Sequence, residues 1–150
     1  MVFEMQVEGF SALEEELDAL SKAAGKGVLR RALKSSAEPM AKLMRLAAPR
    51  GDGDLVESIA VSDKLSPHQR AQHRRMFRDD RAAVEMFVGA GPLPQAHNTE
   101  FGNIHQAPQP WARPAWDRDH QAMLKRLGEE LWAELSKAIA RAERRATKRM

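Results

Sequence analysis

The sequence contains no cysteine and no tyrosine, and only 5% of its residues are aromatic. Without cysteine there is no disulfide framework, no thiol nucleophile and no cysteine-ligated zinc site. No stretch approaches the ~20 apolar residues of a membrane-spanning helix, and the first residues show neither the basic start nor the apolar run of a secretory signal. We therefore expect a soluble intracellular protein with a core of Leu, Ala, Met and Val.

The length of 150 residues, 43% of them hydrophobic, is sufficient for one domain of ordinary size. We predict a single domain over 1–150 that carries a basic insert at 63–81 and a basic tail at 143–150. The net charge is only +3, but residues 61–81 hold 6 Lys and Arg against 3 Asp and Glu. Basic segments can contact phosphates or an acidic partner, although a solvated surface is the simpler interpretation.

Hydrophobic periodicity predicts an α+β fold in the order β-α-α-β-(basic insert)-β-α. Alternation of apolar and polar residues predicts strands at 2–8, from Ile59 and at 83–88. The simplest arrangement is a small, mainly antiparallel sheet of three to four strands packed against long helices. In it the strand from Ile59 and the strand at 83–88 pair as a hairpin or meander that the insert joins. A sheet with open edges and long amphipathic helices is typical of an oligomer's protomer.

Helical spacing predicts a first helix from Ser11 that ends at Gly25–Gly27, and a second from about Val28 to Ala47 with a kink at Pro39. Ser66 and Pro67 predict the start of an exposed basic helix within the insert. Residues 92–114 are rich in proline and are expected to be irregular. After Pro114 one long helix is expected, with a buried stripe that includes Trp116, Leu131 and Leu135. Its last 14 residues, strongly basic, are expected to fray or to bind a partner.

The sequence offers few residues for chemistry. It has no phosphate-binding glycine loop and no Gly-x-Ser-x-Gly nucleophile motif. His97, Glu100 and His105 could in principle hold a metal ion, but their spacing matches no zinc signature. The simpler interpretation is that His97 and Glu100 make hydrogen bonds that fix a loop. We therefore predict no catalytic, cofactor-binding or metal-binding residue.

Two further features suggest contacts with partners. Four arginines of the insert are candidates for contact with DNA or with a neighbouring protein: Arg70, Arg74, Arg75 and Arg78. Trp111 lies in an extended Pro-rich stretch, where a large side chain either fills a pocket of a neighbouring molecule or anchors the protein's own core.

Two sets of short motifs, in their order and spacing, resemble one family of phage proteins. The first set precedes the insert: Val7-Glu8-Gly9-Phe10, Ala37-Glu38-Pro39, Ala48-Pro49-Arg50-Gly51 and Leu55-x-x-Ser58-Ile59. The second set follows it: Ala96-His97-x-x-Glu100-Phe101-Gly102 and Pro108-Gln109-Pro110-Trp111-x-Arg113-Pro114-Ala115. They resemble the tail-component, or tail-completion, proteins of long-tailed bacteriophages, prophages and gene transfer agents, which are related to the lambda-type minor tail protein Z group.

The resemblance implies a non-enzymatic structural protein of the virion neck, which completes the tail or joins it to the head. It implies a ring homo-oligomer, expected to be a hexamer, that contacts neighbouring neck and tail-tube proteins after assembly in the bacterial host cytoplasm. No membrane contact is expected. Six residues are then expected to anchor the loop before the last helix or to form an interface: Glu100, Phe101, Gly102, Trp111, Arg113 and Pro114.

Two alternatives remain open. Head closure and tail termination are neck functions of the same class, carried out by small α+β protomers that look alike from sequence. A DNA-binding accessory protein acting through the basic insert is the alternative of another class. For the neck protein itself, non-specific contact of the insert with genomic DNA in the channel is one expectation, and docking on an adjacent ring is the other.

Overall fold

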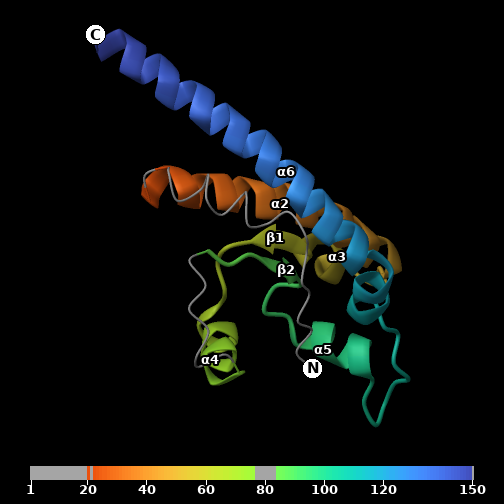
Figure 1. The fold of residues 1–150 in the computed structure, drawn as a ribbon. Helices are drawn as coiled ribbons and strands as arrows, with labels where there is room; N and C mark the ends of the chain where they lie inside the picture. The colour runs from red at the N-terminus through yellow and green to blue at the C-terminus, as the bar shows by residue number, and fades with distance from the viewer. Residues whose placement is uncertain (1–19, 21, 77–83, 150) are drawn as a thin grey trace.

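The computed structural model describes residues 20, 22–76 and 84–149, which form a mostly helical α+β structure (Figure 1). The elements in chain order are α2 (Lys22–Ala47), α3 (Asp54–Ser58), β1 (Ala60–Ser62), α4 (Pro67–Met76), β2 (Phe87–Gly89), α5 (Pro94–Phe101) and α6 (Ala112–Arg149). The strand predicted at 2–8 and most of the helix predicted from Ser11 lie outside the described residues. The sequence predicts three to four strands, and the described residues contain two, so the larger number is not confirmed.

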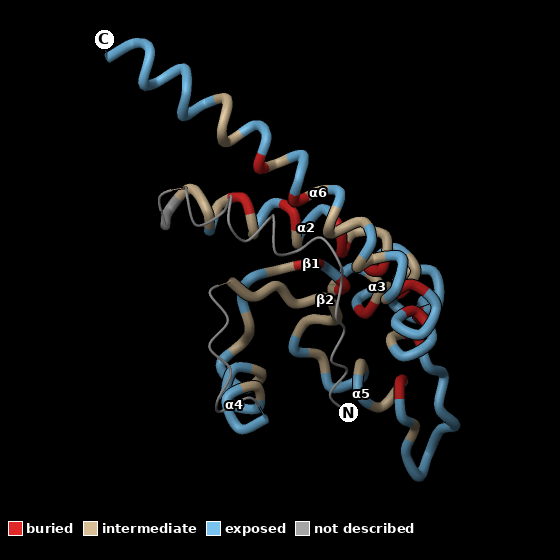
Figure 2. Tube along the Cα trace, in the orientation of Figure 1, coloured by how far each residue is buried: buried red, intermediate tan, exposed pale blue. Residues whose placement is uncertain are grey.

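Helix α2 is the centre of the structure. It packs against α6 on one side and against both strands on the other, so that the layers run from α6 through α2 to the two-stranded ribbon (Figure 1). The residues that α2 buries recur at helical spacing and include Val28, Ala32, Met40 and Met44 (Figure 2). Where α2 meets α6, small residues such as Ala32 let the two backbones approach closely.

The predicted break at Gly25–Gly27 is wrong, because α2 begins at Lys22 and continues through both glycines. A glycine inside a helix costs about 1 kcal/mol relative to alanine, which is too little to end a helix that is packed along its length. Val28, one residue later, is fully buried, and this packing offsets the cost. Pro39 also lies inside α2, as the sequence predicts.

The two strands form an antiparallel ribbon in which Val61 pairs with Val88. This confirms the prediction that the strand from Ile59 pairs with the strand before Gly89, with the basic insert between them. Val61 is buried, and Val88 packs against the same core cluster, so one face of the ribbon covers α2. The insert itself contains α4, in which no residue is buried.

Two predictions about the C-terminal half are corrected. Residues 92–114 are not wholly irregular, since α5 occupies Pro94–Phe101. Pro94 stands in its first turn and Gly102 caps its end, so the residues that suggested a loop act as helix boundaries. Of the two expectations for the last residues of α6, fraying does not hold because the helix continues to Arg149, and binding to a partner stays a prediction.

Helix α6 also places its buried stripe differently from the prediction. Leu131 and Leu135 are buried as expected, but Trp116 is 38% exposed and Ala115 takes its place in the core. Leu131 and Leu135 pack with Val28 of α2 in a cluster separate from the one that contains Ala115.

Candidate functional site

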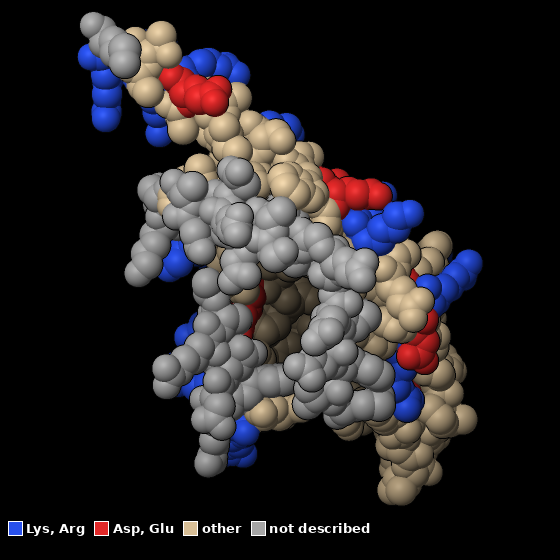
Figure 3. Space-filling view, viewed as in Figure 1, with Lys and Arg blue, Asp and Glu red and all other residues tan. Residues whose placement is uncertain are grey.

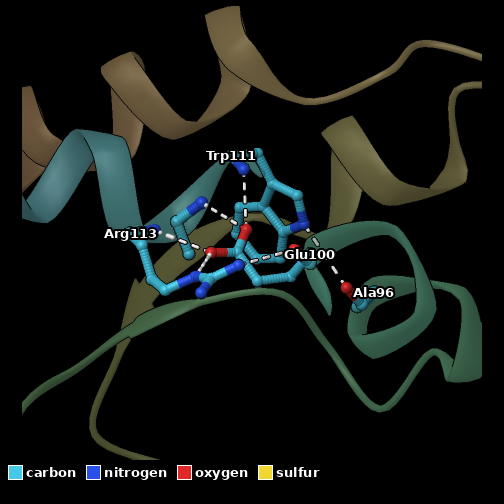
Figure 4. A network of polar contacts seen from close by, with 5 residues as sticks. Ala96, Glu100, Trp111 and Arg113 are labelled. Carbon is cyan, nitrogen blue, oxygen red and sulfur yellow. Dashed lines mark hydrogen bonds and ion pairs between the residues drawn. The ribbon is translucent and has the colours of Figure 1, made fainter. Parts of the chain in front are cut away.

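Glu100 is the most deeply buried charged residue that the structure describes, with 4% of its surface exposed. It lies on the last turn of α5, and its carboxylate points at the first residues of α6 (Figure 4). Its Oε2 accepts hydrogen bonds from the backbone N–H groups of Trp111 (2.6 Å) and Ala112 (2.9 Å), and its Oε1 accepts one from the N–H of Arg113 (3.0 Å). These donors have no partner within their own helix, and the positive end of the helix dipole favours an anion there. Glu100 therefore caps α6 from another helix.

Arg113 completes the connection between α5 and α6. Its Nε donates to Oε1 of Glu100 at 2.8 Å, and its Nη2 donates to the backbone carbonyl of Glu100 at 2.9 Å. The guanidinium also lies 4.5 Å from the ring centre of Phe101, where the aromatic face attracts a cation. The Arg113 side chain thus contacts the carboxylate of Glu100, the main chain of α5 and the aromatic ring of Phe101.

The pKa of Glu100 reflects this environment. Burial by itself raises the pKa of a carboxyl group, because it disfavours the charged form. Hydrogen bonds from the backbone of Ala112, Trp111 and Arg113 and from the Arg113 side chain act in the opposite direction, and together they hold the pKa of Glu100 below its ordinary value of 4.5. The group is therefore a structural anion at neutral pH.

Trp111 fixes the same junction from the side of the core. It is 5% exposed and belongs to the cluster that contains Met40 of α2, and its indole N–H donates to the carbonyl of Ala96 in α5 at 3.4 Å. The structure thus places Trp111 inside its own protomer. The other two tryptophans, Trp116 and Trp132, are 38% and 45% exposed.

Residues 102–110 form an ordered turn between these anchors. Oδ1 of Asn103 accepts hydrogen bonds from the backbone N–H groups of His105 (2.8 Å) and Gln106 (2.9 Å), and the N–H of Asn103 donates to the carbonyl of Gln106 (3.0 Å). The turn projects from the body of the protein (Figure 1). Its tip presents Ile104, whose surface is 94% exposed.

Gly102 is required at the start of this turn. Its φ of 73° lies in the left-handed region, and a Cβ there would stand 2.8 Å from both the backbone nitrogen and the Cδ of Pro108. We expect Gly102→Ala to lower the free energy of unfolding by more than about 1 kcal/mol, since strain and a clash with backbone atoms act together. Gly128→Ala is the matched control, because a Cβ on Gly128 in α6 meets nothing within 4 Å.

Urea unfolding of both variants measures the difference. The control variant Gly128→Ala is expected to raise the free energy of unfolding by up to about 1 kcal/mol, because alanine has a higher helix propensity than glycine. A Gly102→Ala variant as stable as the wild type would show that the turn tolerates a side chain and is not held in this conformation.

The structure does not bring His97, Glu100 and His105 together as metal ligands. Both carboxylate oxygens of Glu100 are engaged by the start of α6, and the ring of His97 lies 4.9 Å from that of Phe101. No group of three or more His, Asp or Glu residues that could hold a metal ion occurs in the described part of the chain. Pro114, the last of the predicted anchors, is an exposed residue in the first turn of α6, where it removes no intrahelical hydrogen bond.

The predicted basic helix begins as expected at Ser66. Its Oγ accepts a bond from the N–H of Gln69 at 3.3 Å, while the side chain of Gln69 accepts one from the N–H of Ser66 at 3.1 Å, which is a reciprocal cap. Arg70, Arg74 and Arg75 of α4 are exposed. Arg78, the fourth candidate, lies outside the described residues.

Among the described residues, one buried ionisable group was missed from the sequence. Asp119 of α6 is 8% exposed and receives two hydrogen bonds from the guanidinium of Arg126, at 2.6 Å and 3.1 Å. The same guanidinium donates twice to the carbonyl of Ser36 in α2. The sequence signal that could have predicted this pair is the i, i+7 spacing of Asp119 and Arg126, which places both on the face of α6 that carries Ala115.

The ionisable groups of this site bind to each other and to the main chain, so the site is structural: it fixes one helix and the turn before it. A comparison with protein families agrees with a structural protein. The family described as "Bacteriophage HK97-gp10, putative tail-component" matches residues 11–102, and the chain therefore belongs to this family of phage tail components, which are parts of the virion. Searches of curated proteins and of solved structures find no match.

The family match spans α2 to α5 and ends at Gly102. It includes Glu100 but not Trp111 or Arg113, so the second half of the predicted signature lies beyond the matched residues. Among the described residues, no helix is both long and apolar enough to span a bilayer.

Proposed function

We propose that this protein is a non-enzymatic neck component that completes the tail or joins it to the head, and that it assembles as a ring, most simply a hexamer, in the host cytoplasm. Membership of a tail-component family supports the placement in the tail. The observation that carries the assembly is the turn at 102–110, which the Glu100 network flanks and which presents Ile104 at 94% exposure. Burial of this side chain against a neighbour would remove its apolar surface from water.

A groove of about 840 Å³ on the same chain is the surface that we propose receives this turn. Its walls come from α4, from the segment between β2 and α5, from α5 and from residues 111–113 at the start of α6, and they include Pro92, Leu93 and Ala96. Ile104 does not line the groove, so the tip of the turn and the groove are separate surfaces. A contact between two different surfaces of identical chains repeats around an axis, and it closes into a ring when the rotation permits.

The heterologous contact is tested with two variants, one on each surface. Ile104→Asp and Leu93→Asp should each weaken self-association at least about tenfold, because each places a charge in an apolar contact. Leu93 stands at the N-cap of α5, where Asp is a favoured residue, so the fold is expected to tolerate it. Light scattering gives the mass of each species, and Ile104→Val serves as the conservative control.

An equimolar mixture of the two variants is the decisive sample. A copy that carries Ile104→Asp keeps an intact groove, and a copy that carries Leu93→Asp keeps an intact turn, so the mixture should form heterodimers but no rings. Oligomers of wild-type mass from either variant alone, or a mixture that stays monomeric while wild-type chains associate, would contradict the proposed contact.

A further inference from the structure

The last third of α6 projects beyond every other described element. The helix has 38 residues, which at about 1.5 Å per residue is about 57 Å. Leu135 is its last buried residue, and residues 141–149 are all exposed (Figures 1 and 2). We call residues 137–149 the C-terminal arm. Ala138 and Ile139 at the start of the arm still pack against the cluster that contains Val28 and Leu135, whereas none of residues 141–149 is buried or half-buried in the described structure.

The charge of the arm is strongly one-sided. It carries six Lys or Arg residues and one Glu, a net charge of +5. Figure 3 shows Lys and Arg side chains along this projecting end. Five of the six share one helical face, because they follow the spacing i, i+4, i+7, i+8 and i+11 and so fall within about 100° of the circumference: Lys137, Arg141, Arg144, Arg145 and Lys148.

These cations are poorly neutralised within the protein. Lys137 pairs with Glu134 at 3.6 Å. Over the described residues, no ion pair is formed by Arg144, Arg145 or Lys148. Several like charges at i, i+4 spacing repel one another, so a ligand with regularly placed negative charges would stabilise the arm.

We infer that the arm binds double-stranded DNA through its phosphates, without reading the base sequence. An α-helix about 10–12 Å across fits the major groove, and a duplex offers one negative charge per about 1.7 Å of its axis. The arm contains no Asn or Gln, the residues that pair with adenine edges, and we assign its Arg and Lys side chains to the phosphates rather than to guanine edges. This inference does not depend on the proposed ring.

The face opposite the cations disfavours a lipid surface as the partner. A helix that lies on a membrane needs large apolar side chains such as Trp, Phe and Leu on that face. Here it carries Ile139, Ala142 and Ala146, together with the polar Glu143 and Thr147.

Fluorescence anisotropy with a labelled duplex of about 30 base pairs tests the inference on the full chain at neutral pH. The wild type should bind with an affinity that falls steeply with salt between about 50 and 200 mM. The triple variant Arg141→Gln/Arg144→Gln/Arg145→Gln should bind at least about tenfold more weakly, and its salt slope should be shallower by about 2.7. Glutamine favours helix, and circular dichroism verifies that the variant is folded.

The matched control is Arg70→Gln/Arg74→Gln/Arg75→Gln in α4, which removes the same charge from another exposed helix. It should change the affinity by less than about threefold, and replacing the three arm arginines by lysine should retain binding. An equal loss in the α4 variant would show that net charge, or the insert, is responsible. Absence of wild-type binding at low salt, or equal binding to phosphatidylserine vesicles or polyglutamate, would overturn the assignment to DNA.

Discussion

Glu100→Gln is expected to lower the free energy of unfolding by about 2–4 kcal/mol. The carboxylate receives three backbone N–H groups and the Arg113 side chain, and its side chain is only 5% exposed. Glutamine has nearly the same shape, but it carries no charge and offers one acceptor oxygen in place of two. Its NH₂ group would also face the N–H donors of α6, which leaves at least one buried donor without a partner.

Urea unfolding of Glu100→Gln measures this loss, with Glu129→Gln as the control. Glu129 lies on α6 away from the helix start, so the control removes the same charge without disturbing a hydrogen bond there. It should leave the free energy of unfolding within a few tenths of a kcal/mol of the wild type, roughly ±0.5 kcal/mol. If the two variants unfold alike, Glu100 does not cap α6 in solution.

The same network predicts how stability depends on pH. The folded-state pKa of Glu100 lies below its ordinary value of 4.5, so the unfolded chain binds the proton more readily than the folded one. The stabilisation is therefore complete above pH 4.5 and is lost as the pH falls through the folded-state pKa. Glu134, whose pKa is lowered chiefly by its hydrogen bond from Arg31, adds in the same direction. Unfolding midpoints from about pH 6 to about pH 3 should fall less steeply in Glu100→Gln.

Trp111→Ala is expected to be the most damaging substitution among the tryptophans, with a loss of about 3–5 kcal/mol. The indole is buried in the core cluster that contains Met40 of α2 and Ala115 of α6, and its removal leaves a cavity in that cluster. The bond from its N–H to the carbonyl of Ala96 is lost as well. Because the same residue lies directly before α6, the cavity would also loosen the helix start that Glu100 caps.

Trp116→Ala provides the comparison, since Trp116 is 38% exposed and stacks on His120 at the surface. We expect Trp116→Ala to lower the free energy of unfolding by much less than Trp111→Ala does. Thermal unfolding followed by circular dichroism ranks the two. A folded Trp111→Ala variant of wild-type stability that no longer assembles would show that Trp111 fills a pocket of a neighbouring copy, contrary to its place in the structure.

The fold was predictable where local signals act over a few residues. The helix start at Ser66 and the pairing of the two described strands depend on neighbours in sequence or on simple alternation. Glycine was overrated as a helix breaker at Gly25–Gly27, because the packing of α2 outweighs its intrinsic cost.

The site was only partly predictable for a physical reason. The sequence suggested that Glu100 fixes a loop, but its partners are backbone N–H groups 11 to 13 residues away, and backbone donors carry no residue-specific signal. The prediction that Trp116 belongs to the buried stripe of α6 was wrong, because it rested on the large apolar surface of the indole. Small Ala115 is buried in the core cluster that contains Met40 of α2 instead, and the ring of Trp116 is 38% exposed.

The role that we propose for this tail component is to complete the phage tail or to join it to the head, and deletion of its gene from the parent phage or prophage tests that role most directly. Negative-stain microscopy of the lysate should show filled heads beside finished, unattached tails. Emptied heads would indicate head closure, and over-long tail tubes would indicate tail termination. Intact, infectious particles would contradict the account.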